Sequence, residues 1–329
     1  MKAAVYTRYG PPDVVMLKEI AKPTPAPDEV LVEVHATTVT TADWRMRASE
    51  FPGGLWLPGR LMTGLWRPRQ QVLGGDFAGV VVAKGSKTTE FELGDGVYGF
   101  TGHGAHAEYL TIRASGAIAP IPDGMSMTEA AALPFGALAA LVFLRDVARL
   151  GPDQSVLILG ASGNVGVYAV QVAKAMGARV TAVARGENHA LLTELGADTV
   201  LDYRHDDVPS GSVTFDIILD PAGVSDFKDA RRALEHSGVY VPLNFGLADV
   251  LRAPLTRLGR RPTMRIGVSG DTRADLESLN AMIEDGGLRP VIDRVLTFDQ
   301  IRDAYAYVEG RHRRGSVVLE VKPTSQAAG

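Results

Sequence analysis

The sequence of 329 residues contains no cysteine. This absence excludes disulfide bonds and thiolate metal sites. It also favours the cytoplasm, because disulfides persist mainly in oxidising compartments. The sequence has no apolar run long enough to predict a membrane span, and its start, MKAAVYTRYG, lacks the apolar core of a signal peptide. A formal net charge of −4 gives no reason to expect nucleic acid as a partner.

The N-terminal part of the chain has the sequence pattern of a β domain. Short alternating segments such as Val30–Val34 and Val80–Ala83 are separated by Gly and Pro, which is typical of strands and turns. A stiff, extended connector is predicted at three prolines, Pro23, Pro25 and Pro27.

From about Met125 the pattern changes to alternating strands and helices. The predicted strands are Val156–Leu159, Val180–Ala184, Val200–Asp202, Phe215–Leu219 and Val239–Leu243. Such alternation predicts a parallel sheet covered by helices on both faces. Strand-like segments return after about Leu288 and end in Gly315–Val321. We therefore predict an α/β protein in which residues 123–287 are inserted between residues 1–122 and 288–329, with a disordered tail at 322–329.

A glycine-rich turn marks the start of the inserted part. Gly160, Gly163 and Gly166 follow a predicted strand and precede a predicted helix. Glycines there allow the backbone to approach a pyrophosphate, which the N–H groups of the helix start then bind. The residues expected to contact this nucleotide are Ala161, Ser162, Gly163, Asn164 and Val165.

The end of the second strand indicates which nucleotide is bound. An NAD site has an acidic residue there, to accept hydrogen bonds from the ribose. The stretch TAVARGENH has Arg185 at that point instead. A guanidinium suits a 2′-phosphate, so we predict NADPH as the cofactor. The alternative is that Arg185 is an ordinary solvated arginine.

The chain resembles the medium-chain dehydrogenase/reductase superfamily, and within it the zinc-free quinone oxidoreductase branch. The resemblance rests on the glycine turn and on the motifs MKAAVYTRYGPPDVV, DEVLVEVHA, VTTADWRMR, GGDFAGVVVAKGS, FELGDGVYG, AALPFGALAAL and LGADTVLDY. It implies a GroES-like β-barrel catalytic domain, an inserted Rossmann-type doubly wound parallel sheet domain, and commonly a homodimer.

The resemblance also implies that the zinc site of related alcohol dehydrogenases is missing. Thr40 stands where those enzymes have a cysteine ligand, and Gly75 where they have a histidine. Neither residue supplies the N, S or carboxylate ligands that zinc needs. We expect His103 and His106 to form hydrogen bonds within a loop; metal ligation is the alternative.

The candidate catalytic residues are Thr40 and Asp43. Quinone reductases of this type often have Asn in the position of Thr40 and Thr in that of Ala139, so the family mechanism transfers poorly at these two positions. Thr40 has a hydroxyl that would donate to a substrate carbonyl; alternatively it caps the backbone at a strand end. Asp43 matches the superfamily pattern, and the alternative is that it pairs with Arg47 and braces the loop. Tyr98, Tyr109 and water are candidate proton donors.

We expect Phe51–Gln71 to line or cover the substrate pocket. Trp56 and Trp66 would contact a flat, hydrophobic substrate; packing against the barrel is the alternative. Arginines alternate with these tryptophans, as on surfaces that bind single-stranded nucleic acid, but one short basic patch is weak support for that function.

Topology places the remaining candidates, because ligands bind at the carboxyl ends of parallel strands. Tyr203 would lie near the adenosine phosphate. Family resemblance adds Phe245 and Gly246 as cofactor-binding residues near the nicotinamide. Thr263–Gly270 would form an edge strand that pairs across a dimer.

Three functions remain open at this point. The first is a zinc-independent, NADPH-dependent reductase of quinones or conjugated carbonyls. The second is a double-bond reductase for one specific enone or enoyl metabolite. The third is an NADPH-binding structural or regulatory protein with little catalysis.

Overall fold

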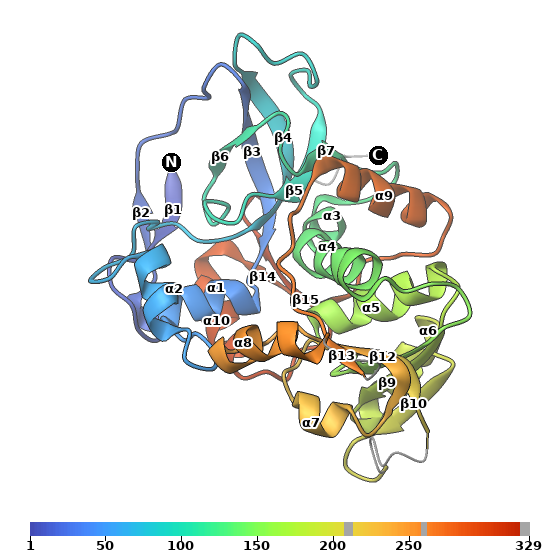
Figure 1. Ribbon diagram of the computed structural model, residues 1–329. Helices are drawn as coiled ribbons and strands as arrows, with labels where there is room; N and C mark the ends of the chain where they lie inside the picture. Colours follow the sequence, from blue (N-terminus) through green and yellow to red (C-terminus); the bar gives the residue numbers. More distant parts are fainter. Residues whose placement is uncertain (207–212, 258–261, 323–329) are drawn as a thin grey trace.

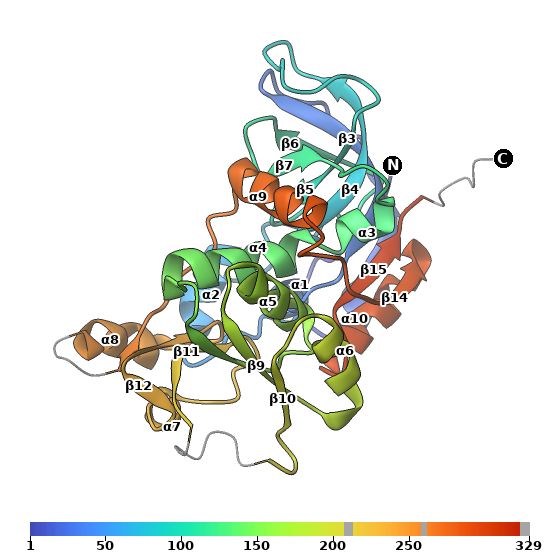
Figure 2. The same cartoon turned by 90° about the vertical axis from the view of Figure 1, so that its right-hand side faces the viewer.

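The computed structural model describes residues 1–206, 213–257 and 262–322 (Figure 1). Apart from Lys322, the tail predicted to be disordered lies outside these ranges. Two large sheets occupy different halves of the molecule, and both views show this separation (Figures 1 and 2). One sheet is parallel and the other is mixed. The expected combination of a GroES-like unit and a Rossmann-like unit is therefore confirmed.

The parallel sheet contains every strand predicted for the inserted part. In spatial order its strands are β10 (Thr199–Asp202), β9 (Arg179–Ala184), β8 (Ser155–Leu159), β11 (Phe215–Asp220), β12 (Leu234–Pro242) and β13 (Thr263–Met264). All neighbouring pairs are parallel. Along the chain, β8, β9 and β10 follow one another toward one edge of the sheet. β11, β12 and β13 then follow one another toward the opposite edge. Nucleotides bind at such a reversal point.

The mixed sheet is built by both ends of the chain. Its strands, in order, are β14 (Ile292–Thr297), β15 (Ser316–Glu320), β3 (Glu29–Thr38), β4 (Asp76–Lys84), β5 (Gly96–Phe100) and β7 (Ile118–Pro120), and β6 (Tyr109–Arg113) pairs with β3. A separate hairpin pairs β1 (Lys2–Val5) with β2 (Met16–Glu19). β15 pairs with β3, so the C-terminal segment closes a sheet that the N-terminal segment begins.

Helices connect and cover the two sheets. The α-helices are α1 (Thr41–Ala48), α2 (Trp56–Thr63), α3 (Met127–Ala131), α4 (Pro134–Val142), α5 (Asn164–Ala175), α6 (His189–Glu194), α7 (Phe227–Ala230), α8 (Leu247–Thr256), α9 (Arg273–Glu284) and α10 (Ile301–Glu309). The tighter or wider turns are η1 (Pro12–Val14), η2 (Phe143–Ala148), η3 (Gly186–Asn188) and η4 (Phe298–Gln300). None of the helices within the described ranges combines the length and the apolar character needed to cross a membrane.

The largest apolar cluster joins the two sheets through α4. This helix is rich in alanine and almost completely buried. Gly136 allows it to pack closely on α5, because a Cβ at this position would lie 2.5 Å from Asn164 Oδ1. The cluster contains Ala78 and Tyr98 of the mixed sheet as well as Val156 and Ile158 of the parallel sheet. Small side chains in α4 thus bring the two halves together.

The predicted edge strand is shorter than expected. β13 ends at Met264, so most of Thr263–Gly270 forms no ladder. Arg265 follows the strand: its backbone N still donates to Tyr240 O of β12 at 2.9 Å, whereas its Nη1 donates to Val147 O at 3.1 Å and to Ala148 O at 2.9 Å. The side chain thus ties the chain after β13 to the end of η2.

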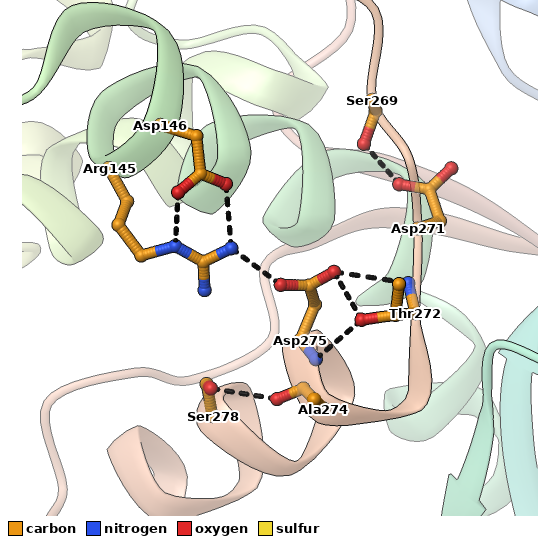
Figure 3. A network of polar contacts seen from close by, with 8 residues as sticks. All are labelled: Arg145, Asp146, Ser269, Asp271, Thr272, Ala274, Asp275 and Ser278. Carbon is orange, nitrogen blue, oxygen red and sulfur yellow. Dashed lines mark hydrogen bonds and ion pairs between the residues drawn. The ribbon is translucent and has the colours of Figure 1, made fainter.

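A polar network then anchors the start of α9 (Figure 3). Thr272 and Asp275 form a capping box, in which Thr272 Oγ1 donates to Asp275 Oδ2 at 2.6 Å. Arg145 of η2 donates to Asp275 at 2.6 Å and, through two nitrogens, to Asp146 at 2.7 Å. Burial would raise the pKa of Asp275, but the Thr272 hydrogen bond and Arg145 outweigh it and lower the pKa.

A fully buried carboxylate, Asp76, links the mixed sheet to α4. It lies at the start of β4, and its Oδ1 accepts from Phe135 N at 2.8 Å. Its Oδ2 accepts from Thr38 Oγ1. Burial raises the pKa of Asp76 well above its ordinary value, against the effect of the Thr38 hydrogen bond.

We predict that Asp76→Asn makes stability less dependent on pH. A carboxyl whose folded pKa is raised contributes stability that is complete below the unfolded pKa and is lost as pH rises through the folded pKa. The free energy of unfolding of the variant, relative to the unchanged protein, should therefore increase by up to about 1.4 kcal/mol per pH unit above roughly pH 4. Urea unfolding between pH 4.5 and 8.5 measures this, with the exposed Asp123→Asn as the control. A difference independent of pH would contradict the prediction.

Candidate functional site

The glycine turn lies at the reversal point of the parallel sheet. Gly160 has φ +68°, and a Cβ there would lie 2.6 Å from Ala222 Cβ. A Cβ at Gly166 would lie 2.5 Å from Gly160 O, so the first turn of α5 packs directly on the end of β8. α5 begins at Asn164 after the N-cap Gly163. Its first N–H groups have no partner within the helix, so this loop can hold a phosphate.

The loop residues predicted to contact the nucleotide differ in what they offer. Ala161 is fully buried, and its N donates to Val183 O at 3.0 Å. Asn164 is also buried, and its side chain accepts from Ser316 Oγ at 3.0 Å. The backbone of Ser162, rather than its side chain, contacts the mixed-sheet unit: Gly315 N donates to Ser162 O at 3.1 Å. Mainly backbone groups, including those of Val165, are therefore available to the nucleotide.

Arg185 and Tyr203 lie together at the ends of β9 and β10, where the sequence placed them. Arg185 Nε donates to Tyr203 Oη at 2.9 Å. Its Nη2 lies 3.1 Å from His312 Nδ1. His312 belongs to the segment before β15, so the mixed-sheet unit contributes to this end of the site. Sequence reasoning missed His312, although the basic stretch RHRR at 311–314 was a visible signal.

Asp202, at the end of β10, is an acidic residue near this cluster. Its Oδ1 accepts from Arg204 N at 3.0 Å and Nε at 3.1 Å. Its Oδ2 accepts from Gly186 N at 2.8 Å and Arg204 Nη2 at 2.9 Å. The Arg204 hydrogen bonds hold the pKa of Asp202 well below its usual range. Because both oxygens already accept two hydrogen bonds, Asp202 is poorly placed to bind a ribose.

Thr40 and Asp43 hold each other at the start of α1. Thr40 Oγ1 donates to Asp43 Oδ2 at 2.6 Å, and Asp43 N donates to Thr40 Oγ1 at 3.2 Å. Both residues are buried. Thr40 thus donates its hydroxyl proton within the capping box. This agrees with the capping alternative, because in this geometry the hydroxyl is not free to donate to a substrate. Asp43 Oδ1 accepts from Gly74 N at 3.0 Å.

Asp43 does not pair with Arg47. The Arg47 guanidinium donates instead to Gly10 O at 2.7 Å and to Glu309 Oε2 at 2.7 Å. This corrects the expected brace: Asp43 braces the loop through Gly74 N, and Arg47 braces α1 against α10. Asp43 and Arg47 thus both help to position α1.

The segment Phe51–Gln71 reaches the parallel-sheet unit through its glycines. A Cβ at Gly53 would lie 2.5 Å from Gly246 Cα, and Leu247 N donates to Gly53 O at 2.8 Å. This segment therefore lies directly beside Phe245 and Gly246, next to α8 (Figure 1). Trp56 begins α2 and is 51% exposed, whereas Trp66 lies in the bend after α2 and is 88% exposed. Trp56 is closer along the chain to the Gly53–Gly246 contact.

A second contact between the units involves residues that sequence reasoning did not select. Arg45 of α1 donates through Nη1 to Asn244 Oδ1. Asn244 follows β12, and its Nδ2 donates to Pro221 O at 2.8 Å, directly after β11. Arg313 donates through Nη2 to Thr41 Oγ1 at 2.7 Å. Arg45 thus faces the carboxyl ends of β11 and β12 from the side of α1.

The other candidates lie in structural contacts. His106 is buried and its Nε2 lies 2.8 Å from Thr38 O, whereas His103 lies in an exposed loop. Tyr98 donates to Asn280 at 2.6 Å, and Tyr109 donates to Glu33 at 2.8 Å. Ala139 is buried in α4. Across the part of the chain that the structure describes, no three His, Asp or Glu side chains are grouped so as to hold a metal ion.

Comparisons with known proteins support the same picture. Residues 26–123 match the family model "Alcohol dehydrogenase GroES-like domain", and residues 195–319 match "Zinc-binding dehydrogenase". A 2-methylene-furan-3-one reductase of Solanum lycopersicum is 31% identical over 98% of this chain and 80% of its own. A chloroplastic NADPH-dependent alkenal/one oxidoreductase of Arabidopsis thaliana is 29% identical over 97% and 79%.

A solved structure is similar along its whole length. The quinone oxidoreductase of Coxiella burnetii superposes with a TM-score of 0.84 at 27% identity, covering 98% of this chain and 99% of that one. Like the two relatives above, it spans both sheet units.

We predict that Asp43→Asn lowers the free energy of unfolding, so that its effect is not confined to the reaction. The amide keeps one oxygen but places an N–H group against the donors that Asp43 now accepts from. Leaving a buried donor unpaired costs about 1–3 kcal/mol, so the free energy of unfolding should decrease by that amount in urea unfolding. Asp226→Asn, at the exposed N-cap of α7, is the control, because Asn and Asp cap equally well. Lost turnover with unchanged stability would instead assign Asp43 to the reaction.

Proposed function

Because this chain belongs to the medium-chain dehydrogenase/reductase superfamily, in its quinone-oxidoreductase-like branch, we propose that it is a zinc-independent, NADPH-dependent reductase of quinones or conjugated carbonyls. NADPH would supply a hydride to the acceptor. The chain's own residues bind the cofactor, hold the acceptor beside it and limit access of water.

The cofactor part of the proposal is supported by the fit of the glycine turn. The close packing of Gly166 on Gly160 O leaves the start of α5 open to a pyrophosphate. Arg185, Tyr203 and His312 would bind the 2′-phosphate. Of the carboxylates near this end of β9 in the described structure, Asp202 already accepts four hydrogen bonds, and Glu187 lies 3.7 Å from Arg314. One relative is named as NADPH-dependent, which agrees with this assignment.

The metal part of the proposal rests on the donor set. Thr40 uses its hydroxyl to cap α1, and Gly75 has no side chain to offer. The chain has no cysteine. These residues do not fit a catalytic zinc ion, although one matching family model carries zinc in its description.

The observation that carries the proposed reaction is that Thr40 caps α1 and, with Gly75, offers no zinc ligand there. Oxidation of a simple alcohol develops alkoxide-like charge, which a metal ion stabilises well. Reduction of a quinone or enone spreads the incoming charge to a distant oxygen, and a few hydrogen-bond donors suffice. Trp56 and Trp66 would favour a flat acceptor at the edge of the site.

A second candidate function is a double-bond reductase for one specific enone. It is favoured by the names of two relatives, which are reductases of a methylene-furanone and of alkenals or alkenones. A homodimer, pairing near β13, and a cytoplasmic location stay predictions from the sequence. Phe245 and Gly246 stay predicted neighbours of the nicotinamide.

The acceptor preference tests the proposal. We expect NADPH oxidation with a quinone and with an enone, and at least about tenfold lower kcat/KM for NADP with primary or secondary alcohols. Treatment with a chelator should not change turnover. Comparable alcohol oxidation, or loss of turnover with the chelator, would contradict the zinc-free proposal. Efficient turnover of one enone without any quinone would favour the second candidate.

We also predict that NADPH binds about ten- to a hundredfold more tightly than NADH, since a hydrogen bond to a charged group contributes about 1.5–3 kcal/mol. Arg185→Ala should remove most of this difference by weakening NADPH alone. Fluorescence titration of both cofactors measures it. Arg179→Ala, at the opposite end of the same strand and exposed, is the matched control. Equal affinities in the unchanged protein would overturn the assignment.

A further inference from the structure

The contact region between α1 and the carboxyl ends of β11 and β12 carries arginines that form no close ion pair with any described residue. Thr41 and Arg45 are four residues apart in α1 and so lie on one face of the helix. Arg45 reaches Asn244, and Arg313 reaches Thr41. Among the ion pairs of the described residues, none involves Arg45, Arg311 or Arg313.

Both guanidiniums are held in place and partly dehydrated. Burial lowers the pKa of Arg45, and repulsion from Arg311 adds to this effect. Burial also lowers the pKa of Arg313 to about 10, although Asp293 and Asp43 act in the opposite direction. Arg313 Nε is buried and has no hydrogen-bond partner among the described residues. Withdrawing a charged group from water in this way costs free energy unless an anion pairs with it.

Within the described residues, none of the nearby carboxylates forms an ion pair or a hydrogen bond with Arg45 or Arg313. Asp43 accepts from Thr40 and Gly74, as described above. Asp293 attracts Arg313 from a distance and lies 3.8 Å from the guanidinium of Arg294, its neighbour in β14. Glu50 attracts Arg45 in the same way, without a hydrogen bond.

Arg45 and Arg313 lie at different ends of the site. Arg313 lies two residues before Gly315, which contacts the glycine turn, so Arg313 is on the phosphate side. Arg45 instead contacts Asn244, which is bound to Pro221 at the end of β11. The carboxyl ends of these strands are where the reacting end of a dinucleotide meets its partner.

We propose that Arg45 is a specificity-determining residue that binds a carboxylate of the acceptor, so that this enzyme prefers conjugated carbonyl compounds bearing a negative charge. This inference rests on the proposed function. Asn244 holds the guanidinium at the carboxyl ends of β11 and β12, and Arg313 lies on the other side of Thr41, toward the phosphate side. The same anionic chemistry is offered by the cofactor phosphates, and the experiment separates the two sources.

The test compares 4-oxopent-2-enoate with its methyl ester, which share the enone and differ in the carboxylate. We expect kcat/KM to be about ten- to a hundredfold higher for the acid in the unchanged protein. Arg45→Gln should bring the ratio of acid to ester close to one, and Arg45→Lys should keep part of it. Arg289→Gln, an exposed arginine paired with Glu194, is the control with the same change of charge.

Binding without turnover provides the independent measurement. 4-Oxopentanoate has no double bond to reduce, and calorimetry with the NADPH-bound protein should detect its binding to the unchanged protein and its loss in Arg45→Gln. NADPH titration of Arg45→Gln should give a dissociation constant within about threefold of the unchanged protein.

Three outcomes would overturn the inference. Equal turnover of acid and ester by an otherwise active enzyme leaves the proposed function intact and removes the role of Arg45. Weakened NADPH binding in Arg45→Gln with an unchanged acid-to-ester ratio assigns Arg45 to the cofactor. If no conjugated acceptor reacts, the proposed function fails, and absent 4-oxopentanoate binding then overturns this inference as well.

Discussion

The buried carboxylate of Asp43 determines how the mixed-sheet half of the site is arranged. It accepts hydrogen bonds from the backbone and hydroxyl of Thr40 and from Gly74 N. These bonds fix where α1 begins and tie that point to the segment before β4. Because α1 is short, its orientation follows from its first turn, and so do the directions of Thr41 and Arg45. The hydrogen bonds of Asp43 can thereby decide which groups the proposed acceptor meets.

The parallel-sheet half depends on close backbone approach. Gly166 packs on Gly160 O, and Gly53 packs on Gly246, at distances that leave no room for a Cβ. The first contact sets the start of α5 against the end of β8, where the phosphates of the proposed cofactor would be held. The second brings the segment before α2 against the residues after β12. The first therefore shapes the parallel-sheet half itself, and the second joins the two halves.

Much of the fold follows from local sequence patterns, and the exceptions have identifiable causes. The strands of the inserted part were predictable because short, mainly apolar runs of three to five residues alternate with helical segments. β13 was overestimated, since nothing local indicates that Arg265 binds the carbonyls at the end of η2. Likewise, Asp43 and Arg47 lie one helical turn apart and suggest an ion pair, yet Arg47 finds Glu309 from distant α10.

The sequence by itself determined the superfamily resemblance, the glycine turn, the absence of cysteine ligands and the basic end of β9. Each of these depends on residue type at short spacing, where chain geometry leaves few choices. Only the tertiary structure decided that Thr40 uses its hydroxyl for Asp43, that His312 meets Arg185, and that Arg45 meets Asn244. His312 and Arg185 are 127 positions apart, and Arg45 and Asn244 are 199 apart. Such contacts depend on how two sheets pack through α4, because the energy that places them comes from burial of the whole cluster and not from the residues that meet.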